Sequence, residues 1–129
     1  MSQPLIQLKL SARLVWEGEK FFGPGTAELL EGVDRWGSLR ASAQEMGMAY
    51  SKAWTMFRKA ERILGYPLLE REVGGARGGS SRLTPRGREL LEGYRRLENA
   101  VNQTGAQMME ELFSSRAIMK ARETDLGSK

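Results

Sequence analysis

The stretch "SLRASAQEMGMAYSKAWTMFRKAERIL", residues 38–64, reads as two helices joined by a tight turn. Ser38 stands where it can cap the first helix, and Gly47 stands where that helix should end. The second helix begins almost at once, near Tyr50, and stops before Gly65. A short helix joined to a longer one by three or four residues that include a glycine is a helix-turn-helix. This pair decides the fold class that we predict.

The second helix has an apolar face and a basic face. Ala53, Phe57, Ala60 and Leu64 recur at helical spacing on the apolar face. The opposite face, which is rich in positive charge and hydrogen-bond donors, holds Ser51, Lys52, Thr55, Arg58, Lys59 and Arg62. The alternative for any single cation is a solvated helix surface. Trp54, at the edge between the faces, is interpreted as a structural brace.

The segment after this helix, "YPLLEREVGGARGGSSRLTP", residues 66–85, reads as a strand, a glycine-rich tip and a second strand. A Walker-type phosphate loop needs a lysine and then a helix after its last glycine, but two serines and a strand follow Gly79. An ordinary flexible hairpin is the other alternative. Because the hairpin is basic and directly follows a helix-turn-helix, we interpret it as the wing of a winged helix. Contacts with phosphates or the minor groove are predicted for Arg77, Ser80, Ser81 and Arg82.

Regular patterns also flank this central region. Every second residue from Ile6 to Trp16 is apolar, which predicts a half-buried strand, and "FFG" at residues 21–23 is expected to pair back on it. A first helix is predicted from a cap at Thr26 to a stop at Gly37. Thr84 is expected to cap a long last helix, and residues 114–129 to fray from its end.

The long last helix has an apolar seam with spacings of four and three, which is typical of coiled coils. The seam residues for which we predict a dimer interface are Leu90, Tyr94, Leu97, Val101 and Met108. The alternative is that the seam packs on its own domain, and its first half is expected to do both. A single winged helix reads only a few base pairs, so a second copy would double the length of DNA that is read.

Composition excludes several classes of function. The chain has 129 residues and a net charge of +4, and it contains neither cysteine nor histidine. Without these residues, thiolate and imidazole chemistry is absent, and an enzyme is not expected. No signal peptide or membrane-spanning run is evident, so we expect a cytoplasmic protein without membrane contact. Six basic residues against two acidic ones between residues 35 and 62 indicate an anion-binding surface.

These observations predict one mainly α-helical domain with a small β component. It would consist of an N-terminal strand or hairpin (1–23), a winged helix-turn-helix (24–84), a long dimerisation helix (85–113) and a frayed tail (114–129). Within it, the recognition helix would span about 50–64 and the wing about 68–84. Strands with base-stacking aromatics, as single-stranded RNA binders use, are not evident.

Residues 37–91 resemble the N-terminal DNA-binding domain of the ModE-type molybdate-responsive transcription regulators. The matching pieces are Gly37-Ser38, the run "AYSKAW" at 49–54, the double glycines at 74–79, and Leu83-Thr84 with Gly87. More distantly, "LGYPLLER" and "LTPRGREL" are similar to the winged helix of LysR-type regulators. The match covers roughly residues 1–113.

The resemblance implies a DNA-binding regulator. Together with the seam of the last helix, it predicts a sequence-specific transcriptional regulator that binds double-stranded DNA as a homodimer. By the helical wheel and by the matching positions of the family, the predicted base-reading end of the recognition helix comprises Tyr50, Ser51, Lys52, Thr55 and Arg58, with Lys59 added to the surface. The molybdate-binding domains of full-length ModE-type regulators have no counterpart here, so no cofactor is expected. The alternative function is a dimeric protein-interaction adaptor, or an antagonist of a full-length regulator.

Overall fold

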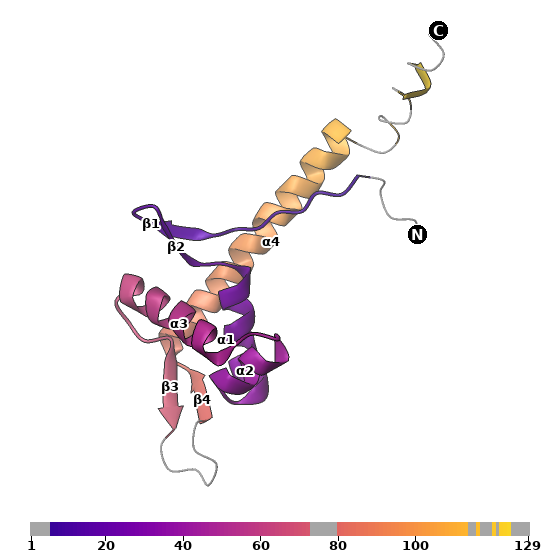
Figure 1. Ribbon diagram of the computed structural model, residues 1–129. Coiled ribbons are helices and arrows are strands. Elements are labelled where there is room, and N and C mark those ends of the chain that lie inside the picture. Colours follow the sequence, from indigo (N-terminus) through magenta and orange to yellow (C-terminus); the bar gives the residue numbers. More distant parts are fainter. Residues whose placement is uncertain (1–5, 73–79, 114–115, 117–119, 121, 125–129) are drawn as a thin grey trace. The chain divides into compact units, whose positions relative to one another are not determined.

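The computed structural model describes residues 6–72 and 80–113, and residues 116, 120 and 122–124 of the tail (Figure 1). The elements follow one another as β1 (Leu14–Trp16), β2 (Glu19–Phe22), α1 (Pro24–Trp36), α2 (Leu39–Glu45), α3 (Tyr50–Leu64), β3 (Leu69–Glu72), β4 (Ser80–Leu83) and α4 (Pro85–Phe113). The chain divides into two compact units. One comprises residues 11–96, and the other residues 1–10 and 97–129.

The unit of residues 11–96 has a helical core between two small antiparallel hairpins. Phe57, Leu29 and Leu68 are buried in one apolar cluster, to which α1, α3 and the segment before β3 contribute. Helices α1 and α2 cross closely at Gly32, where an added Cβ would lie 2.0 Å from Ser42 Oγ. The Ser42 hydroxyl donates to the Leu29 carbonyl at 2.8 Å, which satisfies this buried polar group. The result is a winged helix-turn-helix fold.

The strands of one hairpin agree with the prediction from the sequence, and the first strand of the other does not. Strands β3 and β4 pair from Leu69 opposite Leu83 to Glu72 opposite Ser80, as the wing requires. Strand β1 covers only residues 14–16, so the prediction of one continuous strand from Ile6 to Trp16 is wrong. The four-residue β2 is its only partner among the described residues, and nothing pairs with residues 6–13 to extend the ladder.

Helix ends follow local capping chemistry. Helix α1 begins at Pro24 with Gly23 as its N-cap, not at a Thr26 cap as predicted; proline suits this position because the first helical N–H needs no partner. Thr26 is instead buried within the first turn. The helix ends at Gly37, whose φ of 86° is left-handed. Ser38 caps α2 as predicted, its hydroxyl accepting the Ala41 N–H at 3.0 Å.

The Ser38 cap leads to a stability prediction. Ser38→Ala should lower the free energy of unfolding by about 1 kcal/mol, because the Ala41 N–H loses its acceptor. Chemical denaturation followed by circular dichroism measures the change. Ser38→Asp supplies an equivalent oxygen and should unfold near the wild-type midpoint. Equal losses in the two variants would assign the effect to the serine itself rather than to the cap.

The first turns of α4 belong to the core of the same unit. Thr84 Oγ1 accepts the Gly87 N–H at 2.9 Å and donates to the Pro67 carbonyl at 2.8 Å, so the cap also fixes the helix to the segment before β3. Tyr94 is 3% exposed, packs edge-on against Phe22 at 5.0 Å, and donates to the Ala12 carbonyl at 2.7 Å. Tyr94 therefore belongs to the core, and its assignment to a dimer seam needs correction.

Ion pairs join α4 to α1 as well. Arg88 donates to both carboxylate oxygens of Asp34, at 2.7 and 3.0 Å. The hydrogen bonds that Arg88 donates to Asp34, together with the negative charge of Asp34, raise the pKa of Arg88. Arg95, two helical turns further along α4, donates to a single carboxylate oxygen of Glu31. Such exposed pairs orient α4 more than they stabilise it.

The second unit combines the N-terminal segment with the later part of α4. Residues 6–10 run without regular secondary structure beside this helix (Figure 1). Leu8 and Leu10 lie against Gly105, where an added Cβ would be 2.6 Å from Leu8 Cδ2. Glycine thus permits this close approach. Leu97, Val101 and Met108 remain 44%, 41% and 46% exposed on the helix surface.

Within the described residues, no helix has both the length and the apolarity needed to cross a bilayer.

Candidate nucleic-acid interface

Helix α3 is buried on one side and open to solvent on the other. Ala53, Phe57 and Ala60 point into the core, as the periodicity predicts. The predicted contact residues lie off this face: Ser51, Lys52, Thr55 and Arg58 are exposed, and Tyr50 and Lys59 are half-buried. No acidic residue occurs along α3 before Glu61. The first two-thirds of the helix therefore present an uninterrupted polar and cationic surface.

Hydrogen bonding limits what one of these side chains offers to a ligand. The Thr55 hydroxyl donates to the Ser51 carbonyl oxygen at 2.9 Å, one turn earlier in the same helix. The hydroxyl proton of Thr55 is therefore not available to a ligand. The methyl group and the lone pairs of the hydroxyl oxygen are still available for contacts. In a DNA groove, such a side chain suits an apolar contact with a thymine methyl or acceptance of a hydrogen bond from a base amino group.

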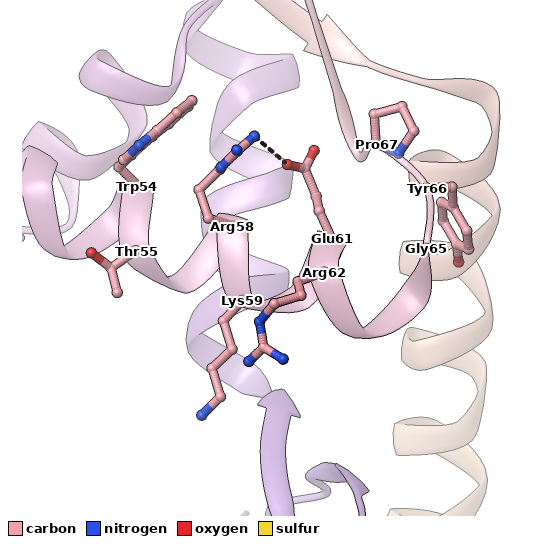
Figure 2. A pocket seen from close by; sticks show the side chains of 9 residues that line it. All are labelled: Trp54, Thr55, Arg58, Lys59, Glu61, Arg62, Gly65, Tyr66 and Pro67. Carbon is pink, nitrogen blue, oxygen red and sulfur yellow. Dashed lines mark ion pairs between the residues drawn. The ribbon is translucent and has the colours of Figure 1, made fainter.

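The cations of α3 divide into two groups. Lys59 and Arg62 both approach Glu19 of the β2 strand, with Nζ and Nη2 at 3.6 and 3.1 Å from the same carboxylate oxygen. Figure 2 shows these two side chains extending away from Trp54 and Arg58. Arg58 is 3.9 Å from Glu61, a longer and weaker pair. The N-terminal cations of α3 are thus freer to meet an anion than Lys59 is.

Aromatic rings hold three arginines near this surface. The guanidinium of Arg40, on α2, lies 4.2 Å from the ring centroid of Tyr50. Arg71 of β3 and Arg58 of α3 lie 4.8 and 5.5 Å from the centroid of Trp54. Sequence reasoning missed Arg40 and Arg71. The spacing of Trp54 and Arg58 by four residues indicates one helix edge, but arginines from α2 and β3 join it only through the tertiary fold.

The wing is described at its base. Ser80 is exposed, and Ser81 is half-buried and donates its backbone N–H to the Gly37 carbonyl at 2.8 Å. Arg82 pairs across the hairpin with Glu70 at 3.0 Å, so its charge is partly neutralised. Arg77 lies outside the described residues. The base of the wing therefore brings Ser80 and Ser81 beside the helix-turn-helix.

Comparison with known proteins finds a similar family for this region. Residues 26–88 match the family described as the bacterial regulatory helix-turn-helix protein, lysR family. The DNA-binding domain of CbnR, solved as a complex with DNA, superposes with a TM-score of 0.54 at 22% identity, covering 67% of this chain and 94% of that one, and shows the common fold. The chain thus contains a winged helix-turn-helix domain similar to those of bacterial transcriptional regulators.

The curated relatives that the chain resembles include proteins of the ModE type. The molybdenum-pterin-binding protein MopA of Rhodobacter capsulatus is 33% identical over 99 residues, which are 77% of this chain and 36% of MopA. The transcriptional regulator ModE of Haemophilus influenzae is 33% identical over 94 residues, 73% of this chain and 34% of that protein. This chain is homologous to such regulators over its N-terminal region. It spans about a third of the length of these relatives.

Proposed function

We propose that this protein binds double-stranded DNA in a sequence-specific manner and thereby regulates transcription. The observation behind the proposal is the exposed face of α3, which holds Lys52, Thr55 and Arg58 and no acid before Glu61. An α-helix fits the major groove, and its N-terminal residues reach the base edges. The crystallised CbnR domain, which shares this fold, is bound to DNA.

In this proposal the contacts have different tasks. Tyr50, Ser51 and Lys52 would meet the groove at the start of α3, with Thr55 and Arg58 one and two turns further on. The wing, with Ser80, Ser81, Arg82 and Arg77, would lie on the backbone or in the minor groove and add affinity without sequence information. Lys59 would have a smaller part because it already pairs with Glu19. The burial of Ala53 and Phe57 keeps the helix in register for these contacts.

We also propose that the protein acts as a homodimer through the exposed apolar side chains of α4. Leu97, Val101 and Met108 recur at spacings of four and seven, and each is more than two-fifths exposed. Pairing with the same residues of a second copy would remove these side chains from water. Two recognition helices would then read half-sites about 34 Å apart, one turn of DNA.

Selection of bound fragments from random duplex DNA tests the proposed function. We expect enrichment of a motif with two related halves, and retention of the protein on duplex DNA that weakens steeply as salt is raised. Salt-sensitive binding without any enriched motif would show that the protein binds DNA without sequence specificity. Failure to bind duplex DNA at low salt would overturn the proposal in favour of a protein-interaction adaptor.

A further inference from the structure

Trp54 stands between two guanidinium groups from different elements. Its ring faces Arg71 of β3 at 4.8 Å and Arg58 of its own helix at 5.5 Å. The side chain is 38% exposed, so it does not merely fill the core. A guanidinium that stacks on an aromatic face leaves its N–H edge free, because the ring contact uses none of the five donors. Trp54 therefore restrains two arginines while leaving them able to bind anions.

A groove lies between the helix-turn-helix and the wing, with a volume of about 450 Å³. Residues of α2, α3, β3 and β4 line it, including Arg40, Arg58, Arg71 and Ser81. Among the described residues that line it, Glu61 is the one acid, so three positive charges face one negative charge, a net charge of +2. Glu61 accepts the Leu68 N–H at 2.8 Å, which fixes the carboxylate at the end of α3. The other charged side chains that line the groove are all arginines.

Two of these arginines are available to an incoming anion. Among the described residues, the structure shows no acid paired with Arg40 or Arg71, whereas Arg82 on the same hairpin pairs with Glu70. Arg40 is stacked on Tyr50 and Arg71 on Trp54, so each is held in place by a neutral group. Guanidinium groups arranged in this way match the tetrahedral oxygens of a phosphate, which accept two N–H bonds from one fork.

We propose that this groove binds one phosphate of the DNA backbone through Arg40 and Arg71, and that Trp54 is a positioning residue that sets Arg71 relative to Arg58. The inference rests on the proposed function and deepens it. Phosphate contacts fix the register of a protein on the duplex, and base contacts read the sequence in that register. The shared Trp54 ring links the two tasks, because moving either arginine changes the support of the other.

The proposal is tested on the full chain with a duplex that the selection enriches. Arg40→Ala and Arg71→Ala should each lower the slope of log affinity against log salt by about 0.9, for matched and mismatched sites alike. Arg96→Ala removes the same charge from the exposed surface of α4 and should change the slope by much less. Wild-type slopes in both groove variants would overturn the phosphate site. Thermal unfolding verifies that each variant is folded.

A double-mutant cycle tests the role of Trp54. Trp54→Leu should weaken binding by about fivefold, the value of one cation–π contact, and Trp54→Phe should recover most of that loss. In an Arg71→Ala background, Trp54→Leu should cost clearly less, because the arginine that it positions is gone. A purely structural role predicts the same cost in both backgrounds, and that result would overturn the positioning role. If the wild-type protein itself does not bind DNA, the proposed function is rejected.

Inorganic phosphate distinguishes the source of the phosphate group. At constant ionic strength, replacing chloride by millimolar phosphate should leave DNA affinity unchanged if the groove takes a phosphate only as part of the duplex. Binding of inorganic phosphate that is lost in Arg71→Ala but leaves DNA affinity unchanged even at saturation would show a site for free phosphate that the duplex does not use, and would contradict the backbone assignment.

Discussion

Replacing Leu97 and Val101 together by glutamate should convert the protein to monomers and weaken its binding to a two-site operator by about 10²–10⁴-fold. Both side chains are exposed on α4, so the change should not disturb the core of residues 11–96. Four glutamates placed face to face in a dimer would repel one another and remain hydrated. Sedimentation measures the assembly, and titration of the two-site duplex measures the affinity.

The large effect has a thermodynamic origin. When two DNA-binding domains are joined, the second half-site is bound from a millimolar effective concentration rather than from dilute solution. A monomer loses this advantage but keeps every contact within one half-site. Its affinity for an isolated half-site should therefore equal that of the wild-type domain. This equality separates loss of pairing from loss of folding.

A matched control uses the same helix and the same charge. Asn102→Glu with Gln103→Glu adds two negative charges at exposed polar positions beside the seam, and the variant should remain dimeric. If the Leu97 and Val101 variant also sediments as a dimer, the interface lies elsewhere. The β1–β2 hairpin is then the next candidate, because Val15 and Trp16 are 51% and 58% exposed on it.

Local signals predicted the helices well because their causes are local. The two faces of α3 follow from the order of its residues, and the ends of α2 and α3 follow from the Ser38 cap and from Gly65 in a left-handed conformation. Each of these depends on neighbours within about one helical turn. The same reasoning placed Ser51, Lys52, Thr55 and Arg58 on one exposed face.

Features that depend on distant residues escaped prediction. Tyr94 continues the periodic seam of α4, yet its burial depends on Phe22 and Ala12, more than seventy residues earlier. The neutralisation of Lys59 by Glu19 likewise joins α3 to a hairpin far away in the sequence. Periodicity reveals which face is apolar, but it does not reveal whether the core of the same chain or another chain covers that face.

The contacts of Trp54 in the candidate nucleic-acid interface also could not be predicted from the sequence. The place of the tryptophan at the edge of α3 favours a structural brace. Its contact with Arg71 depends on the β3–β4 hairpin folding back beside the helix. No spacing in the sequence relates these two residues. Candidate residues on one helix could therefore be predicted, whereas those that the tertiary fold adds could not.

Replacing Arg58 by alanine should abolish the preference for one base pair, at a cost of about 1–3 kcal/mol at that position. The guanidinium is exposed, stacks on Trp54, and is only loosely paired with Glu61 at 3.9 Å. Its fork can therefore turn toward guanine O6 and N7 in a two-pronged contact. Affinities for all single-base variants of the selected site measure the effect.

Two substitutions separate base reading from charge. Arg58→Lys keeps the charge but replaces the planar fork by a point charge, so the preference should be lost almost as fully as in the alanine variant. Arg62→Ala removes the same charge four residues further along α3, where Glu19 already holds the guanidinium, and should leave every base preference intact. If Arg58→Ala weakened binding to all sequences equally, Arg58 would be a phosphate contact. The residues that recognise the DNA bases would then be those at the start of α3, namely Ser51, Lys52 and Thr55.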